Sequence, residues 1–307
     1  MAKGKGKSAV RSGHKSGTTA EGKSGRNGVI SAELREFLRA GEGMDLTEIS
    51  TDGTPGFNGG KRAGTEALAA GARTLSNLQE MFFAGSRFGD DRKVLLILQG
   101  MDTAGKGGVV RHVVGAVNPQ GVHHVAFAAP TKEELGHDFL WRIRRHLPEA
   151  GMIAVFDRSH YEDVLVGRVR ELAPAEEIEK RYELINRFEQ SAVDHGTTVI
   201  KVMLHISAKE QKRRLADRLD RPDKHWKYDP ADVDERMRWA DYQAAYEAAI
   251  QRTSTEVAPW FIVPADRKWF ARLAVQHLLV DALQRMDLAW PAATFDAEAE
   301  KARLAAS

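Results

Sequence analysis

Five short runs of apolar residues recur along the chain, at 93–98, 124–128, 152–156, 198–204 and 260–263. Runs of this kind are typical of strands that are buried on both faces of a parallel sheet. Segments with apolar residues at helical spacing lie between them, at 107–117, 131–147, 174–195, 207–219, 231–252 and 266–286. This alternation predicts one α/β domain with a mostly parallel, five-stranded sheet flanked by helices.

The pattern differs outside this core, which we place at 92–290. Residues 1–28 are rich in Gly, Ser and Lys without an apolar period, which predicts a disordered basic tail. Residues 29–91 form a predicted helical extension, with a short helix at 31–40, a loop at 41–61 and a long helix at 65–88. Residues 291–307 are a predicted C-terminal tail.

The charge of the chain is unevenly distributed. The 307 residues contain 45 Lys and Arg against 43 Asp and Glu, a formal net charge of +2. Residues 1–28 hold seven basic side chains and one acidic one, so the tail carries 7 − 1 = +6 and the remainder +2 − 6 = −4. A binding site for a polyanion in the folded part must therefore come from local clustering of cations.

Composition excludes several function classes. The chain has no cysteine, which excludes a disulfide scaffold, a thiol nucleophile and a Cys-ligated metal site. It has no run of about 18 apolar residues, so we expect no transmembrane helix. The basic N-terminus lacks the apolar region of a signal peptide, and we expect a cytoplasmic protein without membrane partners.

The strongest motif is GMDTAGKGG at 100–108, named the glycine loop below, between the first strand and a helix. It matches the Walker A pattern G-x-x-x-x-G-K, in which backbone N–H groups and the lysine (here Lys106) hold phosphate. The alternative, a glycine-rich turn that only packs tightly, does not explain Lys106. Gly107 stands where Ser or Thr usually binds Mg²⁺. We therefore expect Asp102 to hold the ion, with Thr103 as a weaker candidate.

A second acidic site follows the strand at 152–156. Asp157 ends this strand in the manner of a Walker B aspartate, which reaches the metal, and Arg158 could stabilise charge on a transferred phosphoryl group. The alternative is a structural Asp–Arg pair. Glu162 and Asp163 lie in a predicted first helical turn, where acidic residues interact favourably with the helix dipole without having any other function. We interpret His160 as a hydrogen-bonded residue at the same helix start.

Basic side chains gather in the segment 209–228, which we interpret as a lid of about 209–232 that closes over phosphates. The alternative is a solvated helix with paired charges. A second basic group, Arg142, Arg145 and His146, lies on one face of a predicted helix at 137–147 and could line a channel for an extended polyanion. The lid cations are Arg213, Arg214, Arg218, Arg221, Lys224 and Lys227.

An ordered set of motifs resembles the polyphosphate kinase 2 family, over roughly 45–286. These motifs are GMDTAGKGG (100–108), VNPQGV (117–122), APTKEELGHDFLWR (129–142), FDRSHYEDVLVGRV (156–169), KHWKYDPAD (224–232) and APWFIVPADRKWF (258–270). The resemblance is closest to the class III branch, although that branch often has Asn at Asp157 and Asp at Gly107. It implies a P-loop kinase fold with a helical lid.

The resemblance also implies an activity and partners. The activity is reversible, Mg²⁺-dependent phosphoryl transfer between inorganic polyphosphate and AMP or ADP, with Mn²⁺ as a substitute ion. The expected partners are polyphosphate, adenine or guanine nucleotides, and further copies of the chain in a dimer or tetramer, but no specific nucleic acid. The rival functions are an ATP-dependent nucleoside monophosphate kinase, which Gly107 disfavours, and a polyanion-binding protein without activity.

The predicted site residues combine the motif chemistry with this resemblance. The catalytic residues are Asp102, Lys106, Asp157 and Arg158, with Asp102 and Asp157 as metal ligands. The phosphate-binding residues are Gly105, Gly107, Gly108, Arg111, Arg142, Arg218, Arg221, Lys224 and Lys227. Pro130 and Thr131 form the nucleotide-side wall that the resemblance implies.

Overall fold

The computed structural model describes residues 29–30 and 33–307, and its centre is a five-stranded sheet. The strands are β3 (Lys93–Gln99), β4 (Val122–Ala126), β5 (Ile153–Asp157), β6 (Thr197–His205) and β7 (Trp260–Pro264). They are all parallel, in the order β4-β5-β3-β6-β7. The predicted fold class is confirmed, and each predicted strand is present within about two residues of its bounds.

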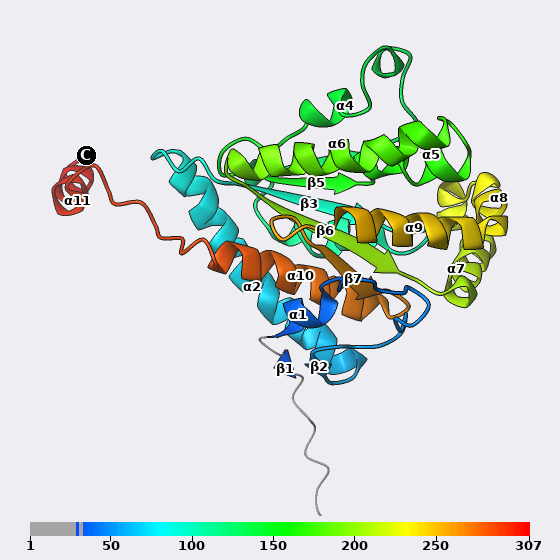
Figure 1. Cartoon of the computed structure of the whole chain (residues 1–307). Helices are drawn as coiled ribbons and strands as arrows, with labels where there is room; N and C mark the ends of the chain where they lie inside the picture. The colour runs from blue at the N-terminus through cyan, green and yellow to red at the C-terminus, as the bar shows by residue number, and fades with distance from the viewer. Residues whose placement is uncertain (1–28, 31–32) are drawn as a thin grey trace, which may run out of the picture.

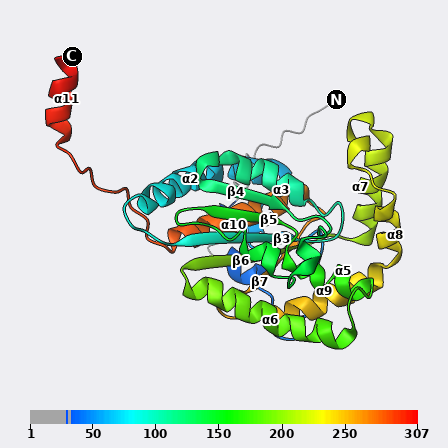
Figure 2. The same ribbon diagram turned by 90° about the horizontal axis from the view of Figure 1, so that it is seen from above.

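Helices cover both faces of this sheet (Figures 1 and 2). One face carries α2 (Lys61–Ser86), α3 (Lys106–His112) and α10 (Lys268–Gln284), and the other carries α5 (Val166–Val169), α6 (Ala175–Asp194) and α9 (Trp239–Thr253). The central strand β3 is buried on both faces, as its apolar sequence predicts. β4 differs, because it is an edge strand and exposes His123 and His124, so the prediction of burial on both faces was wrong there.

The long N-terminal helix packs along the C-terminal part of the core. Two glycines of α2 allow α10 to approach: a Cβ at Gly64 would lie 2.2 Å from the Trp269 ring, and one at Gly71 would lie 2.2 Å from Gln276. Gln276 donates a hydrogen bond from its side-chain amide to the Leu68 carbonyl. The helix before the sheet is therefore part of the layer that covers it. Before it come β1 (Val29–Ile30), α1 (Leu34–Leu38) and β2 (Phe57–Asn58), and β1 pairs antiparallel with β2.

The predicted lid is a helical protrusion at the carboxyl edge of the sheet (Figure 1). It consists of α7 (Ala208–Asp220), the 3-10 helix η5 (Pro222–Lys227) and α8 (Ala231–Met237). The helix predicted at 231–252 is interrupted at Arg238, which separates α8 from α9. This break lets α8 belong to the protrusion while α9 packs on the sheet.

The segment 131–147 is the largest difference from prediction, because it is not one helix. It contains only the 3-10 helix η3 (Glu134–Gly136) and the short α4 (Trp141–Arg144). Local side-chain bonds compete with the helical ones: the Glu134 carboxylate accepts from the Thr131 backbone N–H, and the Asp138 carboxylate accepts from that of Leu140. Elsewhere the predicted 107–117 helix ends at α3 and continues as η1 (Val114–Ala116), followed by η2 (Pro119–Gly121).

The two ends of the chain complete the description. The predicted disordered tail at 1–28, like Ser31 at the predicted start of the first helix, lies outside the described residues. The C-terminal segment contains α11 (Ala297–Ala305), which stands away from the body in Figures 1 and 2. Within 29–30 and 33–307, no helix has the length and apolar character needed to span a membrane.

Candidate active site

The glycine loop joins the end of β3 to the start of α3 and has a backbone that needs glycine. Gly100 and Gly105 have φ values of +147° and +124°, and a Cβ at Gly100 would lie 2.7 Å from the Leu204 carbonyl oxygen. Thr103 adopts a left-handed conformation with φ of +64°. The loop is therefore a strained turn at the point where the central strand ends, which is common at binding sites.

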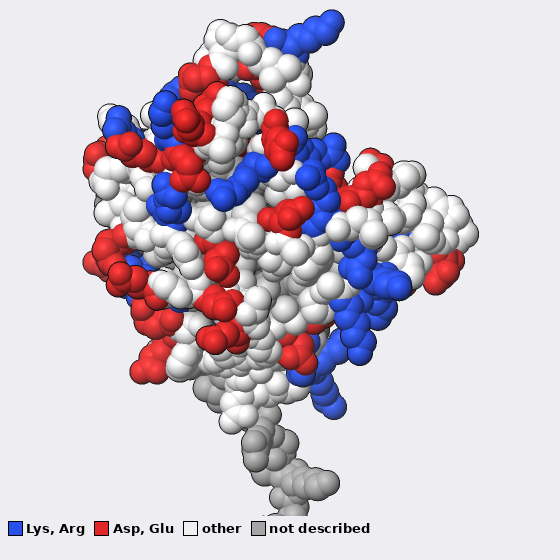
Figure 3. All heavy atoms as spheres, turned by 45° about the vertical axis from the view of Figure 1, so that its right-hand side comes forward, with Lys and Arg blue, Asp and Glu red and all other residues white. Residues whose placement is uncertain are grey.

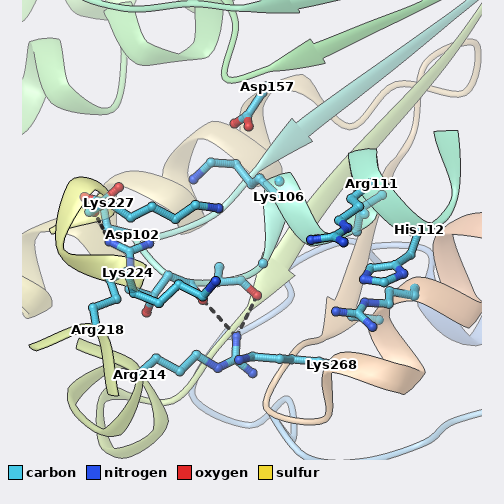
Figure 4. A pocket seen from close by; sticks show the side chains of 18 of the residues that line it. Asp102, Lys106, Arg111, His112, Asp157, Arg214, Arg218, Lys224, Lys227 and Lys268 are labelled. Atoms are coloured by element: carbon cyan, nitrogen blue, oxygen red, sulfur yellow. Dashed lines mark hydrogen bonds between the residues drawn. The ribbon is translucent and has the colours of Figure 1, made fainter. Parts of the chain in front are cut away.

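Lys106 begins α3, and its side chain turns back over the loop. It is 8% exposed, and its Nζ donates to the Gly100 carbonyl oxygen at 2.6 Å. A lysine held in this way keeps two further protons for a ligand. Figure 4 shows Lys106 in the pocket near Asp157, with Asp102 on the neighbouring side.

The two predicted metal carboxylates meet here because their strands are neighbours. β5 pairs with β3 so that Asp157 lies opposite Leu98, next to the start of the glycine loop. Arg158 follows in a left-handed conformation with φ of +65°, and its Nη2 donates to the Asp102 Oδ1 at 2.8 Å. Burial acts to lower the pKa of Arg158, but the surrounding carboxylates, led by Glu162, raise it overall.

Glu162 lies near the site, although it does not line the pocket. It lies in the 3-10 helix η4 (His160–Asp163), and its carboxyl interacts with the charges of Lys106 and Arg158. Burial raises its pKa, whereas those two cations act to lower it. The sequence predicts only a helix-dipole role for Glu162, but η4 has only four residues. Its position five residues after Asp157 is the sequence signal that it lies near the site.

Arg214 was predicted as a lid cation, but it lies beneath the pocket as a clamp. It is 4% exposed, and its guanidinium donates to the carbonyls of Thr103 and Ala104 on one side and of Ala265 and Asp266 on the other. It therefore ties the glycine loop to the segment after β7. Its sequence neighbour Arg213 points away and is mostly exposed.

Four further lid cations line the pocket, and three of them are paired with acids of the lid itself. Arg218 lies 3.0 Å from the Asp232 carboxylate of α8, whereas Arg221 and Lys224 share the Asp223 carboxylate at 2.9 and 2.8 Å. The Lys227 ammonium lies over the Trp226 ring. The pairs of Arg221 and Lys224 are exposed and contribute little to stability.

The opposite wall carries cations without acidic partners. Among the described residues, Arg111, His112, Lys268 and Arg272 have no carboxylate within 4.0 Å. Burial lowers the pKa of His112, and the charges of Arg272 and Arg111 lower it further. Burial lowers the pKa of Lys268, and the charges of Arg214 and Arg213 lower it further. Repulsion between these positive charges favours binding of an anion. Sequence reasoning found Arg111 alone: Lys268 lies in the quoted motif at 258–270 but was given no role, and His112 and Arg272 lie outside the quoted motifs.

These parts enclose one cavity of about 440 Å³ (Figure 4), and basic side chains gather on the side of the molecule that carries the lid (Figure 3). Its lining unites most of the predicted site residues, namely Asp102, Gly105, Lys106, Gly107, Gly108, Arg111, Asp157, Arg158, Arg218, Arg221, Lys224 and Lys227. The sheet topology explains this gathering, because open parallel sheets place ligands at the carboxyl ends of their strands.

Three predicted residues do not line this cavity. The Arg142 guanidinium is buried over the Phe127 ring and donates to the Ala128 carbonyl at 2.9 Å, so it is held away from the pocket. Thr131 makes the turn with Glu134 described above, directly after Pro130. The path for polyphosphate expected along Arg142 and Arg145 is therefore not the cavity that the structure presents.

A metal ion has carboxylate ligands available in the cavity. Asp102 and Asp157 both line it, and the Thr103 hydroxyl oxygen is buried without a hydrogen-bond partner. No group of three or more His, Cys, Asp or Glu side chains is arranged to hold a metal in the described part of the chain. Two carboxylates suit Mg²⁺, which keeps water and substrate phosphate oxygens as its other ligands.

Comparison with known proteins decides the family. The family model described as polyphosphate kinase 2 matches residues 60–290. The chain belongs to the polyphosphate kinase 2 family. A family member of known structure, polyphosphate kinase 2 from Arthrobacter aurescens, is 54% identical, with a TM-score of 0.88 over 91% of this chain and 100% of that one.

Two curated relatives carry functional names. The AMP/ADP-polyphosphate phosphotransferase of Meiothermus ruber is 46% identical over 248 residues, which is 81% of this chain and 91% of the relative. The ADP-polyphosphate phosphotransferase of Rhodopseudomonas palustris is 41% identical over 271 residues, which is 84% of this chain and 92% of the relative. These names agree with the family that the sequence motifs resemble.

Proposed function

We propose that this chain is an enzyme that transfers a phosphoryl group between inorganic polyphosphate and the nucleotides AMP and ADP. The observation that carries the proposal is the single cavity in which Lys106 and the carboxylates Asp102 and Asp157 lie between two walls of cations. Cations in this number suit substrates that bring several phosphates each. The polyphosphate kinase 2 relatives named for this reaction support the same substrates.

The two walls suit different substrates. Polyphosphate carries charge along its whole length, so it fits the wall of Arg111, Lys268 and Arg272, whose cations have no acidic partner to displace and which His112 adjoins. A nucleotide has a few phosphates on a neutral body, and it fits the side where acids and cations alternate, near Asp157 and Arg158. The terminal phosphates would then meet above Lys106.

The reaction needs no general base. A terminal phosphate oxygen of the nucleotide is already anionic and attacks the terminal phosphorus of the chain in line. One new P–O–P bond forms, the chain's terminal P–O–P bond breaks, and polyphosphate shortened by one unit leaves with the bonding electrons. Lys106 and Arg158 stabilise the charge on the transferred group, and positioning supplies most of the acceleration.

Asp102 and Asp157 would hold Mg²⁺, and Mn²⁺ could replace it. When bound, such an ion neutralises negative charge where the two anionic substrates approach. Arg158 pairs with Asp102 in this structure, and it would turn toward the phosphates to stabilise the transferred group.

Other predictions remain proposals. The ATP-dependent nucleoside monophosphate kinase is not favoured, because Gly107 offers no hydroxyl for the metal and the relatives are named for polyphosphate. We keep the homo-oligomer, the cytoplasmic location and adenine or guanine nucleotides as predictions. The polyphosphate path is moved from Arg142 to the wall that contains Arg272.

Donor choice tests the function directly. Purified protein with Mg²⁺ and polyphosphate should convert AMP to ADP and ADP to ATP, as measured by nucleotide chromatography. Formation of ADP from AMP with ATP, but not with polyphosphate, would favour the rival kinase.

The placement of polyphosphate has its own test. Arg272→Gln should raise the KM for long-chain polyphosphate about tenfold and leave the KM for ADP within about twofold, since charge-assisted hydrogen bonds to phosphate are among the stronger ones. Arg62→Gln, on the exposed start of α2, is the control. An equal rise in both KM values would contradict the assignment of the walls.

A further inference from the structure

A buried ionic cluster lies behind the active site and has no part in the reaction described so far. Lys201 of β6 and Glu189 of α6 form an ion pair with Nζ and Oε2 2.6 Å apart, and both side chains are at most 1% exposed. Removing two charges from water is costly, and well-packed apolar residues often serve stability equally well. Stability alone therefore does not account for this pair.

The cluster uses its hydrogen bonds almost completely. The three Lys201 protons are donated to Glu189, to the Thr253 carbonyl and to the Tyr161 hydroxyl. The Tyr161 hydroxyl in turn donates to Glu189 at 2.8 Å, and the Trp260 Nε1–H donates to the Thr253 hydroxyl at 2.9 Å. Such a network has one arrangement, because any shift leaves a buried charge unpaired.

This fixed network holds the segment that carries Arg158. Tyr161 lies three residues after Arg158, and the neighbouring His160 Nε2 lies 3.3 Å from a Glu189 carboxylate oxygen. Ser159 is buried as well, and its Oγ accepts from the Tyr161 backbone N–H and from the Gln99 amide at the end of β3. The cluster therefore connects residues 158–163 to β6, to α6 and to the end of α9.

Arg158 needs such support because its backbone is strained. A left-handed conformation at a residue other than glycine costs free energy and persists only where the surrounding structure imposes it. The backbone N–H of Arg158 donates to the Leu98 carbonyl, which fixes the start of the segment that follows β5. The hydrogen bonds of Tyr161 fix this segment three residues further on.

We propose that the buried cluster of Tyr161, Glu189, Lys201 and Thr253 positions Arg158, which lines the cavity, for phosphoryl transfer. These are positioning residues, because none of them lines the cavity. The inference rests on the proposed function for its kinetic consequence, but the position of the 158–163 segment can be measured independently of activity.

Tyr161→Phe is the main test, because it removes one hydroxyl and keeps the ring against Trp260. We expect kcat for polyphosphate-dependent ATP formation to fall about tenfold, since small misplacements of catalytic groups have effects of this order or larger. The KM values for both substrates should stay within about twofold. Faster hydrogen exchange of the backbone amides at 158–163 should accompany the loss.

Tyr182→Phe is the matched control. Tyr182 is also buried on the same side of the sheet, and its hydroxyl contacts Arg168 without joining the cluster. The kcat of Tyr182→Phe and the hydrogen exchange of its backbone amides at 158–163 should equal those of the wild type. Equal kcat in Tyr161→Phe and Tyr182→Phe, with both proteins folded by circular dichroism, would overturn the proposal.

A second pair of variants keeps the proposal testable if Tyr161→Phe does not fold. Thr253→Val is nearly isosteric and removes the hydroxyl bonds, whereas Thr253→Ser keeps the hydroxyl. We expect kcat to fall severalfold in Thr253→Val and to recover in Thr253→Ser. Equal kcat in both would contradict a positioning role for Thr253.

Failure of the proposed function would look different. If the wild type transfers nothing from polyphosphate, the function is wrong, and the exchange measurement still decides whether the cluster holds residues 158–163. If the wild type is active and exchange at 158–163 is unchanged in Tyr161→Phe, the positioning inference alone is wrong.

Discussion

The floor of the cavity is formed by the glycine loop, with Asp102 and Lys106, and by Arg214 beneath it. The floor and the lid carry similar positive charges but hold them in opposite ways. On the floor, Lys106 and Arg214 are buried, and each donates to backbone carbonyls of the glycine loop or of the segment after β7. On the lid, Arg221 and Lys224 are partly exposed and share one carboxylate, that of Asp223. The side chains of the floor are already held in place before a ligand binds. The lid cations must instead leave the Asp223 carboxylate before they can bind phosphate.

This difference indicates a division of roles. Groups that stabilise a transition state act best when they are already oriented, because no reorganisation is then needed during the reaction. Exposed pairs are weak and can be broken by an anion at little cost. We therefore expect changes to the floor to reduce turnover strongly and changes to the lid to alter substrate binding weakly.

The largest effect should come from the floor itself. Lys106→Ala and Asp102→Asn should each lower kcat by about a thousandfold or more, because each removes a charge next to the transferred group. Circular dichroism and thermal unfolding should show that the fold survives. Near wild-type turnover in either variant would contradict the assignment of the active site.

The next effect concerns the support of the floor. Arg214→Lys keeps the charge but cannot reproduce a guanidinium fork that donates to four carbonyls. We expect kcat to fall about tenfold, as for other misplaced loops, and the Tm to fall by several degrees.

Arg213→Lys is the control, since its neighbouring side chain is 60% exposed and makes only a surface pair with Glu210. If both arginine variants lost the same activity, the clamp would have no special role.

The contrast between floor and lid also shows what sequence reasoning could reach. The strand ends that hold Asp102 and Asp157 follow from the apolar runs and from the Walker A and Walker B patterns, and the pairing of β3 with β5 brings these strand ends together. The residues missed were those to which no motif assigns a role. Arg214 lies in a basic helix whose sequence predicts a lid. Only the structure, in which its buried guanidinium donates to the Thr103 carbonyl, shows that it belongs to the floor.

The prediction of one helix at 131–147 was wrong for a related reason, since tertiary structure and local side-chain bonds outweigh the sequence pattern there. Its apolar spacing is helical, but side-chain bonds of Thr131 and Asp138 to the backbone form turns instead. Arg142 was placed on a polyanion channel by that helical reading, and it is buried once the helix is absent. The spacing of apolar residues alone does not tell whether local side-chain hydrogen bonds or helical backbone hydrogen bonds will form.

A smaller effect should appear in the pH dependence of stability. Hydrogen bonds from Arg213, and less strongly from Arg214, lower the pKa of Glu210 from its ordinary 4.5 to about 2. Because the folded pKa is the lower one, the stabilisation is complete above about pH 4.5 and is lost as the pH falls toward 2.

Thermal unfolding between pH 5 and pH 2 measures this contribution. The Tm of the wild type should fall more steeply over this range than that of Glu210→Gln, which has no carboxyl to protonate. Glu298→Gln, on the exposed helix α11, should follow the wild type. Parallel curves for wild type and Glu210→Gln would show that the Glu210 pairs do not support the floor.

The smallest effect should come from the lid. Asp223→Asn removes the carboxylate that Arg221 and Lys224 share, and so frees two cations for phosphate. Since exposed pairs contribute less than about 1 kcal/mol, the KM for the nucleotide, which we place on the acid-paired side, should fall no more than about fivefold, with kcat unchanged. Initial rates at low salt measure this best, because salt screens exposed charges. A fall in kcat of the size expected for Arg214→Lys would mean that the lid charges, like those of the floor, are already oriented before substrate binds.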